Sequence, residues 1–378
     1  MIGKDQANEH LQPCIELGPS RTDEYAMQTI GYAAHDAQSP LAPFSFERRD
    51  LRDSDVAIEI LYCGVCHSDL HQSRNDWKDW GPTIYPCVPG HEVIGRVLSV
   101  GPSVTRHAVG DLVAVGTMVD SCQHCDQCHR GEEILCREFP TGTFNGHDRI
   151  DGSVTYGGYS KHIVTREEFV LRLPEGLDPS RAGPLMCAGI TVYSPLRQWN
   201  VGPGSRVAVV GIGGLGHLAV RFAAALGATV TVITRSGAKA AEARELGADH
   251  VLLSTSVEAM TKAASSFDVI VDTIPVGHDI TPYVGLLDIE GVVVIVGNLG
   301  LMERFSTLPL ILGRRRITGS PAGGIAQTQE MLDFCAKKQV LPDCEIIAID
   351  TVNEAFERME RGDVRYRFVI DMSSLAAA

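Results

Sequence analysis

The sequence contains no apolar run that approaches the roughly 20 residues needed to cross a bilayer. Its first 25 residues lack the apolar core of a secretory signal and carry charged side chains instead, among them Lys4, Asp5, Glu9, Glu16 and Asp23. Internal repeats and low-complexity tracts are also missing. We therefore predict a globular, cytoplasmic protein with no membrane partner.

Positive charge is scarce: the sequence has 33 Lys and Arg against 47 Asp and Glu, which gives a net charge of -14. A chain this acidic repels a polyphosphate backbone, so we expect no nucleic-acid partner. One stretch departs from this balance: residues 179–241 contain six Lys or Arg and neither Asp nor Glu. That part of the chain is suited to an anionic ligand.

The 378 residues suggest two domains, and the pattern changes once along the chain. Residues 1–26 show neither helical nor strand periodicity and predict a mobile N-terminal extension. Short β-like runs broken by Gly, Pro and Asp fill 56–200 and indicate a β-rich domain. From about 201, apolar strands alternate with helical runs, which predicts a parallel sheet of α/β class. The predicted strands cover 206–211, 229–234, 251–254, 267–273, 291–297 and 317–320, and two amphipathic helices, 328–338 and 353–363, close the chain.

A glycine-rich turn, GIGGLG, joins the first of these strands to a helix. In that context glycines let the backbone approach a diphosphate at the helix N-terminus. The alternative is a tight turn without a ligand. We interpret the turn as dinucleotide-binding, with Gly211, Gly213, Gly214, Leu215 and Gly216 as its residues.

The second strand ends in a basic segment where an NAD site would carry an acid. Arg235 lies 19 residues after Gly216, and Thr234, Ser236 and Lys239 surround it. A guanidinium there can pair with a 2′-phosphate, so the segment favours NADP(H). A solvated basic turn is the alternative.

Four cysteines lie at the spacing of a closed zinc site: Cys122, Cys125, Cys128 and Cys136. Four thiolates surround one tetrahedral Zn²⁺ and leave no position for water, so this site is predicted to be structural. The alternatives are two disulfides or a redox-active pair, and a reducing compartment disfavours the disulfides.

A second set of candidate ligands comprises Cys66, His91 and Cys187, with the carboxylates Asp69 and Glu92 nearby. Each residue alone has an ordinary interpretation as a buried thiol or a structural histidine. Together they resemble a three-ligand zinc site with one open position.

The order of GVCHSDLH, PGHE, the four-cysteine run, Cys187 and GIGGLG resembles the zinc-dependent medium-chain alcohol dehydrogenases. The phrases YCGVCHSDLH, YGGYS, TQEMLDFC and DVRYRFVID are most similar to the cinnamyl alcohol dehydrogenase branch. The resemblance covers about 27–373. It implies a β-rich GroES-like catalytic domain, a doubly wound Rossmann domain, two zinc ions and NADP(H) per chain, and a homodimer or homotetramer. The implied limits are 1–26 for the extension, 27–193 with 330–378 for the catalytic domain, and 194–329 for the Rossmann domain.

The resemblance also assigns roles to the second zinc set. It implies that Cys66, His91 and Cys187 bind the catalytic zinc and that Glu92 lies beside the ion and replaces its water transiently. Asp69 would hold the imidazole of His91. Two thiolates and a neutral imidazole leave Zn²⁺ with no net charge, so the ion can still accept an alkoxide and lower the pKa of a bound alcohol.

A proton relay follows from the same resemblance. Ser68 would take the alcohol proton and pass it through the cofactor ribose toward His71, while hydride moves to the nicotinamide. From spacing alone, His71 could equally be a solvated side chain.

The predicted function is an NADP(H)-linked alcohol dehydrogenase or aldehyde reductase for primary alcohols and aldehydes of aromatic or medium-chain type. The alternatives are an NAD-linked polyol or other secondary-alcohol dehydrogenase and, outside enzymes, a zinc-clipped nucleotide-sensing module. Trp77, Trp80 and Met118 are candidates for an apolar substrate pocket, with ordinary loop packing as the alternative.

Overall fold

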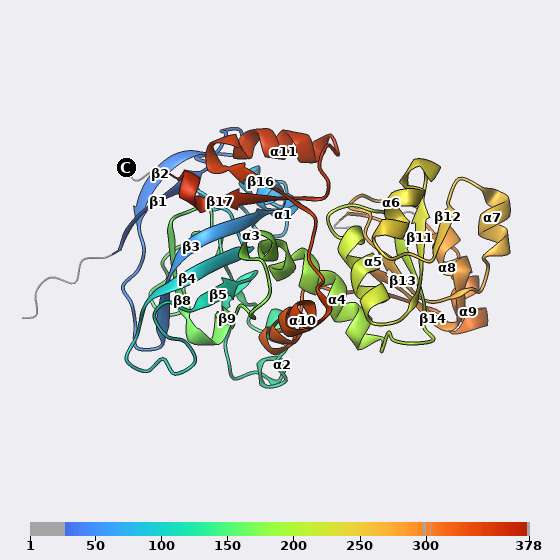
Figure 1. Cartoon of the computed structure of the whole chain (residues 1–378), viewed down its shortest axis with the longest axis horizontal. Coiled ribbons are helices and arrows are strands. Elements are labelled where there is room, and N and C mark those ends of the chain that lie inside the picture. The colour runs from blue at the N-terminus through green and yellow to red at the C-terminus, as the bar shows by residue number, and fades with distance from the viewer. Residues whose placement is uncertain (1–26, 298–299, 303, 376–378) are drawn as a thin grey trace, which may run out of the picture.

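The computed structural model describes residues 27–297, 300–302 and 304–375. The predicted N-terminal extension, 1–26, lies outside the described residues. Two β-sheets form the centres of two bodies that lie side by side (Figure 1). No helix in the described part of the chain is long and apolar enough to span a membrane.

The first body is β-rich, as the pattern of 56–200 predicts. Its seven-stranded sheet has the order β16-β17-β3-β4-β5-β9, with β8 paired to β3. The pairs are antiparallel except β16 with β17. The strands are β3 (Asp55–Val65), β4 (Val93–Val100), β5 (Leu112–Val115), β8 (His162–Arg166), β9 (Leu171–Arg172), β16 (Cys344–Ala348) and β17 (Arg367–Asp371). Two small pairs flank it: β1 (Gln28–Ala33) with β2 (Ala42–Glu47), and β6 (Met118–Asp120) with β7 (Thr141–Gly142).

The second body is a six-stranded parallel sheet in the order β12-β11-β10-β13-β14-β15. This order confirms the doubly wound prediction, and it places the switch in strand order beside β10. The strands are β10 (Arg206–Val210), β11 (Thr229–Thr234), β12 (His250–Leu253), β13 (Phe267–Asp272), β14 (Leu287–Ile295) and β15 (Arg316–Gly319). Ligands of such sheets bind at the carboxyl ends of the strands, where β10 continues into the glycine-rich turn.

The helices near the zinc sites are short, and those of the parallel sheet cover its two faces. The helices are α1 (His67–Ser73), α2 (Asp126–His129), α3 (Pro179–Ala182), α4 (Ala188–Gln198), α5 (Gly216–Ala225), α6 (Ala240–Glu245), α7 (Val257–Lys262), α8 (Thr281–Leu286), α9 (Leu308–Gly313), α10 (Ile325–Lys338) and α11 (Val352–Glu360). Helices α10 and α11 confirm the two amphipathic helices predicted at the end of the chain.

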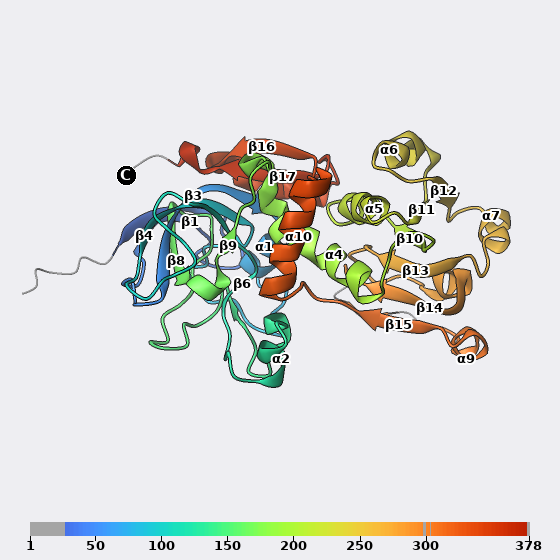
Figure 2. The ribbon, with the colours of Figure 1, turned by 60° about the horizontal axis from the view of Figure 1, so that its bottom comes forward.

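Helix α4 was not predicted, and it lies between the two bodies beside α10 (Figure 2). Its β-branched residues and Pro195 disfavour a helix locally, but burial of most of its side chains overrides that preference. The carboxylate of Glu330 on α10 accepts a hydrogen bond from Tyr193 (2.9 Å) and pairs with Arg197 (2.9 Å). The predicted domain limit at 193/194 falls inside this helix.

Candidate active site and metal centres

The predicted open metal set is brought together at the junction of the two bodies. Cys66 follows β3, His91 and Glu92 precede β4, and Cys187 precedes α4. One potential ligand atom from each residue lies within 4.8 Å of the others. The two sulfurs are 3.9 Å apart. Two thiols, an imidazole and a carboxylate at this spacing fit a zinc ion.

Asp69, in the first turn of α1, holds this set from behind. Its fully buried carboxylate accepts four hydrogen bonds, two on each oxygen. The donors are the backbone N–H of Cys66 (2.9 Å), the backbone N–H of Gly90 (2.9 Å), His91 Nδ1 (2.9 Å) and the hydroxyl of Tyr159 (3.1 Å). Because Nδ1 is engaged, Nε2 is the imidazole nitrogen left for the metal.

The two thiols are hydrogen-bonded to each other, and either sulfur can be the donor. A hydrogen bond with Cys187 is the largest effect that lowers the pKa of Cys66 well below its usual value. The same bond, with burial and the neighbouring thiolate, raises the pKa of Cys187 well above it. A divalent cation supplies the charge that lets both sulfurs be thiolates.

Sequence reasoning missed Arg367, the cation beside this set. Its guanidinium donates to Glu92 Oε1, and both side chains are buried. Burial raises the pKa of Glu92 to about 7, although Arg367 acts in the opposite direction. Glu92 Oε2 has no hydrogen-bond partner among the described residues. A buried carboxyl oxygen without a partner fits a nearby metal ion.

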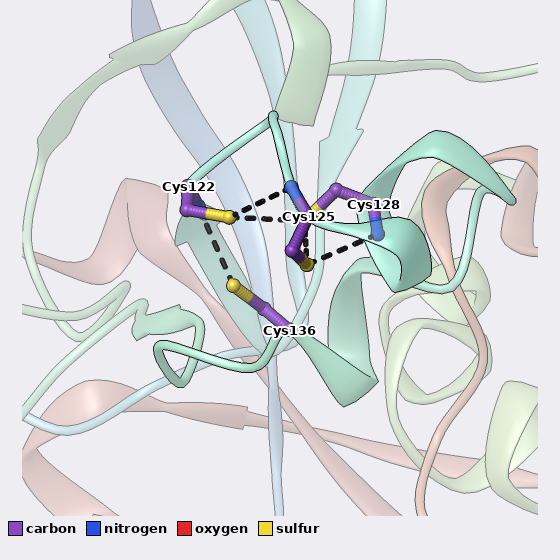
Figure 3. Close-up of side chains that lie close together, drawn as sticks. All are labelled: Cys122, Cys125, Cys128 and Cys136. Atoms are coloured by element: carbon purple, nitrogen blue, oxygen red, sulfur yellow. Dashed lines mark hydrogen bonds between the residues drawn. The ribbon is translucent and has the colours of Figure 1, made fainter.

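The four-cysteine run forms a compact cluster, and each Sγ atom lies within 4.8 Å of the others (Figure 3). Backbone N–H groups point at three of the sulfurs: Cys122 N to Cys136 Sγ (3.5 Å), Cys125 N to Cys122 Sγ (3.3 Å) and Cys128 N to Cys125 Sγ (3.5 Å). Backbone hydrogen bonds from Arg137 and Cys128 lower the pKa of Cys125 to about 6. N–H donors aimed at sulfur stabilise thiolates, whereas burial raises the pKa of Cys122 and raises that of Cys128 to about 12. None of the four cysteines is in a disulfide, and four sulfurs at this spacing fit a closed zinc site.

The predicted relay residues lie on one face of α1. Ser68 Oγ is 3.6 Å from Cys66 Sγ, so its hydroxyl borders the open metal set. His71 is three residues further and partly exposed, and its Nδ1 pairs with Asp76 at 2.8 Å. Trp77 packs against the His71 ring with centroids 5.7 Å apart.

The other predicted substrate-pocket residues are divided between the interior and the surface. Met118 is buried in β6, and Trp80 is 73% exposed. Another aromatic residue, Phe144, stacks on the His91 imidazole with centroids 5.7 Å apart. Sequence reasoning missed Phe144, because nothing in its local pattern places it beside the ligand.

The predicted cofactor residues line a cavity of about 600 Å³ at the carboxyl ends of β10 and β11. Gly211, Gly213, Thr234, Arg235, Ser236 and Lys239 all contribute to its wall. The Arg235 side chain is exposed and makes no hydrogen bond or ion pair with any described residue. A Cβ at Gly213 would meet nothing within 4 Å, which leaves room for a ligand against the backbone. The cavity therefore fits a dinucleotide with an anionic group near Arg235.

A smaller cavity of about 200 Å³ continues from Gly213 toward the open metal set. Its wall includes Gly214, His67 and Arg367, so it contains parts of both bodies. The other two turn residues do not line either cavity. Gly216 lies so close to Gly211 that a Cβ would stand 2.2 Å from its carbonyl oxygen, and Leu215 packs against the core.

Comparisons with known proteins agree with this geometry. Residues 52–175 match the family model for the alcohol dehydrogenase GroES-like domain, and residues 214–337 match that for zinc-binding dehydrogenases. The probable formaldehyde dehydrogenase of Bacillus subtilis is 49% identical over 92% of this chain and 99% of its own. An NADP-dependent alcohol dehydrogenase C of Mycolicibacterium smegmatis is also 49% identical, over 92% and 99%.

A solved structure of a cinnamyl alcohol dehydrogenase from Sorghum bicolor superposes with a TM-score of 0.87. It is 45% identical and covers 92% of this chain and 98% of its own. Identity at this level over nearly the whole length confirms the resemblance noted from the motifs. The chain belongs to the zinc-dependent medium-chain alcohol dehydrogenases, with a GroES-like catalytic unit and a Rossmann-like sheet.

Proposed function

We propose that this dehydrogenase interconverts primary alcohols and aldehydes of aromatic or medium-chain type and uses NADP(H). The observation that carries the proposal is the continuity of the site. The open metal set and the glycine-rich turn are joined by Arg367, which contacts Glu92 and lines the cavity beside Gly214. A zinc-clipped sensing module needs no such connection, and its open thiol set would have no use.

When bound, zinc supplies Lewis acidity toward the substrate oxygen, and NADP(H) accepts or donates the hydride. We assign Cys66, His91 and Cys187 as ligands of this zinc, and Glu92 as a carboxylate beside it. Asp69 keeps the His91 ring oriented. The four cysteines Cys122, Cys125, Cys128 and Cys136 would hold the second, structural ion.

The proton path is assigned to α1. Ser68 borders the metal set, so its hydroxyl is placed to accept the proton of a bound alcohol. His71 lies closer to solvent on the same face of the helix and would receive that proton through the cofactor ribose. Its Nδ1 atom lies 2.8 Å from Asp76 Oδ2, a contact that orients the ring at the surface.

The preference for NADP(H) is assigned to Arg235 with Thr234, Ser236 and Lys239. An exposed guanidinium without a carboxylate partner, at the end of β11, is available for the 2′-phosphate. The relative from Mycolicibacterium smegmatis is named as NADP-dependent, which supports the same choice. An NAD-linked polyol dehydrogenase would place an acid there.

The test is a substrate panel with both cofactors. Purified zinc-loaded protein should reduce aldehydes of graded size faster with NADPH than with NADH, with cinnamaldehyde and medium-chain aldehydes among the best. Polyols should be poor substrates in the oxidative direction. A preference for NADH with polyols would select the alternative.

We also propose a homodimer formed through the edge of the parallel sheet. Strand β15 is the last strand of that sheet, and β15 and α9 lie at its free end (Figure 2). Ile289, Ile311 and Leu312 expose more than two thirds of their side chains on β14 and α9. Exposed apolar groups beside an open strand edge fit a second copy. Sedimentation of Leu312→Asp should show monomers where the wild type shows dimers or tetramers.

The proposed domain limits are 27–193 with 330–378, and 194–329, and the proposed compartment is the cytoplasm. Two thiol clusters that bind metal only when reduced support a reducing compartment. Limited proteolysis and cell fractionation test these two assignments.

A further inference from the structure

A buried histidine lies directly beneath the glycine-rich turn. His217 is the second residue of α5, and its side chain is fully buried. Its Nδ1 atom is 2.9 Å from the carbonyl oxygen of Gly213, which also accepts the backbone N–H of His217 at 3.1 Å. Since a carbonyl only accepts, Nδ1 carries the hydrogen and donates it.

This hydrogen bond fixes the orientation of one peptide group. In a trans peptide the C=O and the following N–H point in opposite directions. When the Gly213 carbonyl is held toward α5, the Gly214 N–H points away from the helix. Gly213 and Gly214 both line the smaller cavity, so that N–H is directed where a diphosphate would lie.

The His217 ring orients the Gly213 peptide without adding a charge. Burial lowers the pKa of His217 to about 3, so the imidazole is neutral at physiological pH. Its Nε2 atom has no hydrogen-bond partner among the described residues. If this position only needed packing, an apolar side chain would fill it without burying an unpaired nitrogen. The hydrogen bond from His217 Nδ1 to Gly213 is what an apolar side chain could not provide.

The other face of the ring contacts the catalytic unit. His217 stacks on Tyr366, with centroids 4.4 Å apart and planes 11° apart. The Tyr366 hydroxyl donates to Glu242 on α6, and the next residue is Arg367. A Cβ at Gly214 would stand 3.1 Å from Arg367 Cδ, and Arg367 also contacts Glu92, so Arg367 borders both the turn and the metal set.

We propose that His217 is a positioning residue for the cofactor diphosphate, acting through the Gly213 carbonyl and the Tyr366 ring. The proposal rests on dinucleotide binding in the proposed function. It does not require the 2′-phosphate, because the turn contacts only the diphosphate common to NADP(H) and NAD(H).

The experiment compares ligands with and without a diphosphate on zinc-loaded protein. His217→Phe keeps a ring against Tyr366 and loses the donor, so the NADPH dissociation constant should rise about five- to tenfold, as expected for one lost hydrogen bond. Binding of adenosine 2′-monophosphate, which lacks the diphosphate, should change less than about twofold by the same reasoning. His217→Gln can donate to the i−4 carbonyl and should recover part of the loss.

Phe222→Leu is the matched control, because Phe222 is equally buried on α5 and distant from the turn. It should lower thermal stability and change the dissociation constants of NADPH and adenosine 2′-monophosphate by the same factor. If His217→Phe fails to fold, Tyr366→Leu removes the stack, leaves His217 in place and should produce the same selective loss. Equal weakening of both ligands, or unchanged NADPH binding in a folded His217→Phe, would overturn the proposal.

Failure of the proposed function gives a different result. If the wild type binds NADH and not NADPH, the cofactor assignment is wrong, and the same variants are then tested with NADH against adenosine. Selective loss of NADH binding would still support the role of His217, and equal losses would overturn it.

Discussion

Removal of one hydroxyl, in Tyr159→Phe, tests whether the hydrogen bonds around Asp69 tune the catalytic metal site. Tyr159 is fully buried and donates to Asp69 Oδ2 at 3.1 Å. A hydrogen bond to a charged group contributes about 1.5–3 kcal/mol, and the other three donors to Asp69 remain, so we expect a loss of about 1–2 kcal/mol in unfolding free energy. If the proposed catalytic domain unfolds as a unit of about 150–250 residues, that corresponds to a fall of roughly 2–8 °C in its Tm.

The same change should weaken zinc binding at the open site. Loss of a residue that holds a metal ligand costs about 10- to 100-fold in affinity. Tyr159 contacts Asp69, and Asp69 in turn holds His91, so Tyr159 is one hydrogen bond further from the metal. We therefore expect the zinc affinity of the open site to fall by about three- to tenfold. Cobalt substitution separates the two sites, because two thiolates with one imidazole absorb differently from four thiolates. Competition with a chelator then measures the open site alone.

Tyr193→Phe is the control for this variant. The Tyr193 hydroxyl also donates to a carboxylate, Glu330, at 2.9 Å, and the residue is equally buried. Because the Glu330 side chain is 49% exposed, Tyr193→Phe should cost less stability than Tyr159→Phe, and it should leave metal affinity unchanged. An open-site affinity in Tyr159→Phe equal to that of the wild type would refute the reasoning, because Asp69 would then hold His91 without help from Tyr159.

The remaining predictions concern the ions, the cofactor, the proton path and acid stability. Cys122→Ser should lower thermal stability, whereas Cys66→Ser should leave a folded, inactive protein, and metal analysis should find one zinc in each and two in the wild type. Arg235→Asp should raise the KM for NADPH about ten- to a hundredfold, as for a lost charged hydrogen bond, and the KM for NADH much less; equal losses would contradict the 2′-phosphate assignment. Ser68→Ala should lower kcat steeply with zinc content and NADPH binding unchanged, and near-normal kcat would exclude the relay. Because burial depresses the pKa of His217 from 6.5 to about 3, the unfolded chain binds this proton first, so its contribution to stability is complete above pH 6.5 and is lost as the pH falls toward 3; denaturant titrations should show a shallower acid loss in His217→Phe.

Local patterns predicted most of the fold because the parallel sheet is built from local signals. Strands β10, β11 and β13 are almost continuous buried runs, and periodicity finds such runs directly. Strand β15, at the edge of the sheet, contains no buried residue. Helix α4 was not predicted because its β-branched residues are more typical of a strand than of a helix, and Pro195 disfavours a helix. Its stability comes from contacts with α5 and α10, which no local window contains.

The metal ligands were found because zinc imposes its own spacing on the chain. Cys125 and Cys128 lie at the start of α2, three residues apart, which is the separation that brings two thiols to one ion. Arg367, Tyr159 and His217 obey no such rule. They act through hydrogen bonds or stacking with residues that the fold alone brings near, such as Glu92, 275 positions from Arg367.

A physical rule could nevertheless have found the Arg367–Glu92 pair in the sequence. A charge in a strand that is covered on both faces is buried, and a buried charge needs a partner or a metal. The phrase RFVID begins with such a cation, and PGHE contains a carboxylate directly before the apolar start of VIGRV, whose Arg96 is exposed. Direct contact between two buried charges of opposite sign offsets the desolvation cost of both. Pairing them would have placed the last strand of the chain beside the catalytic metal before any coordinates were known.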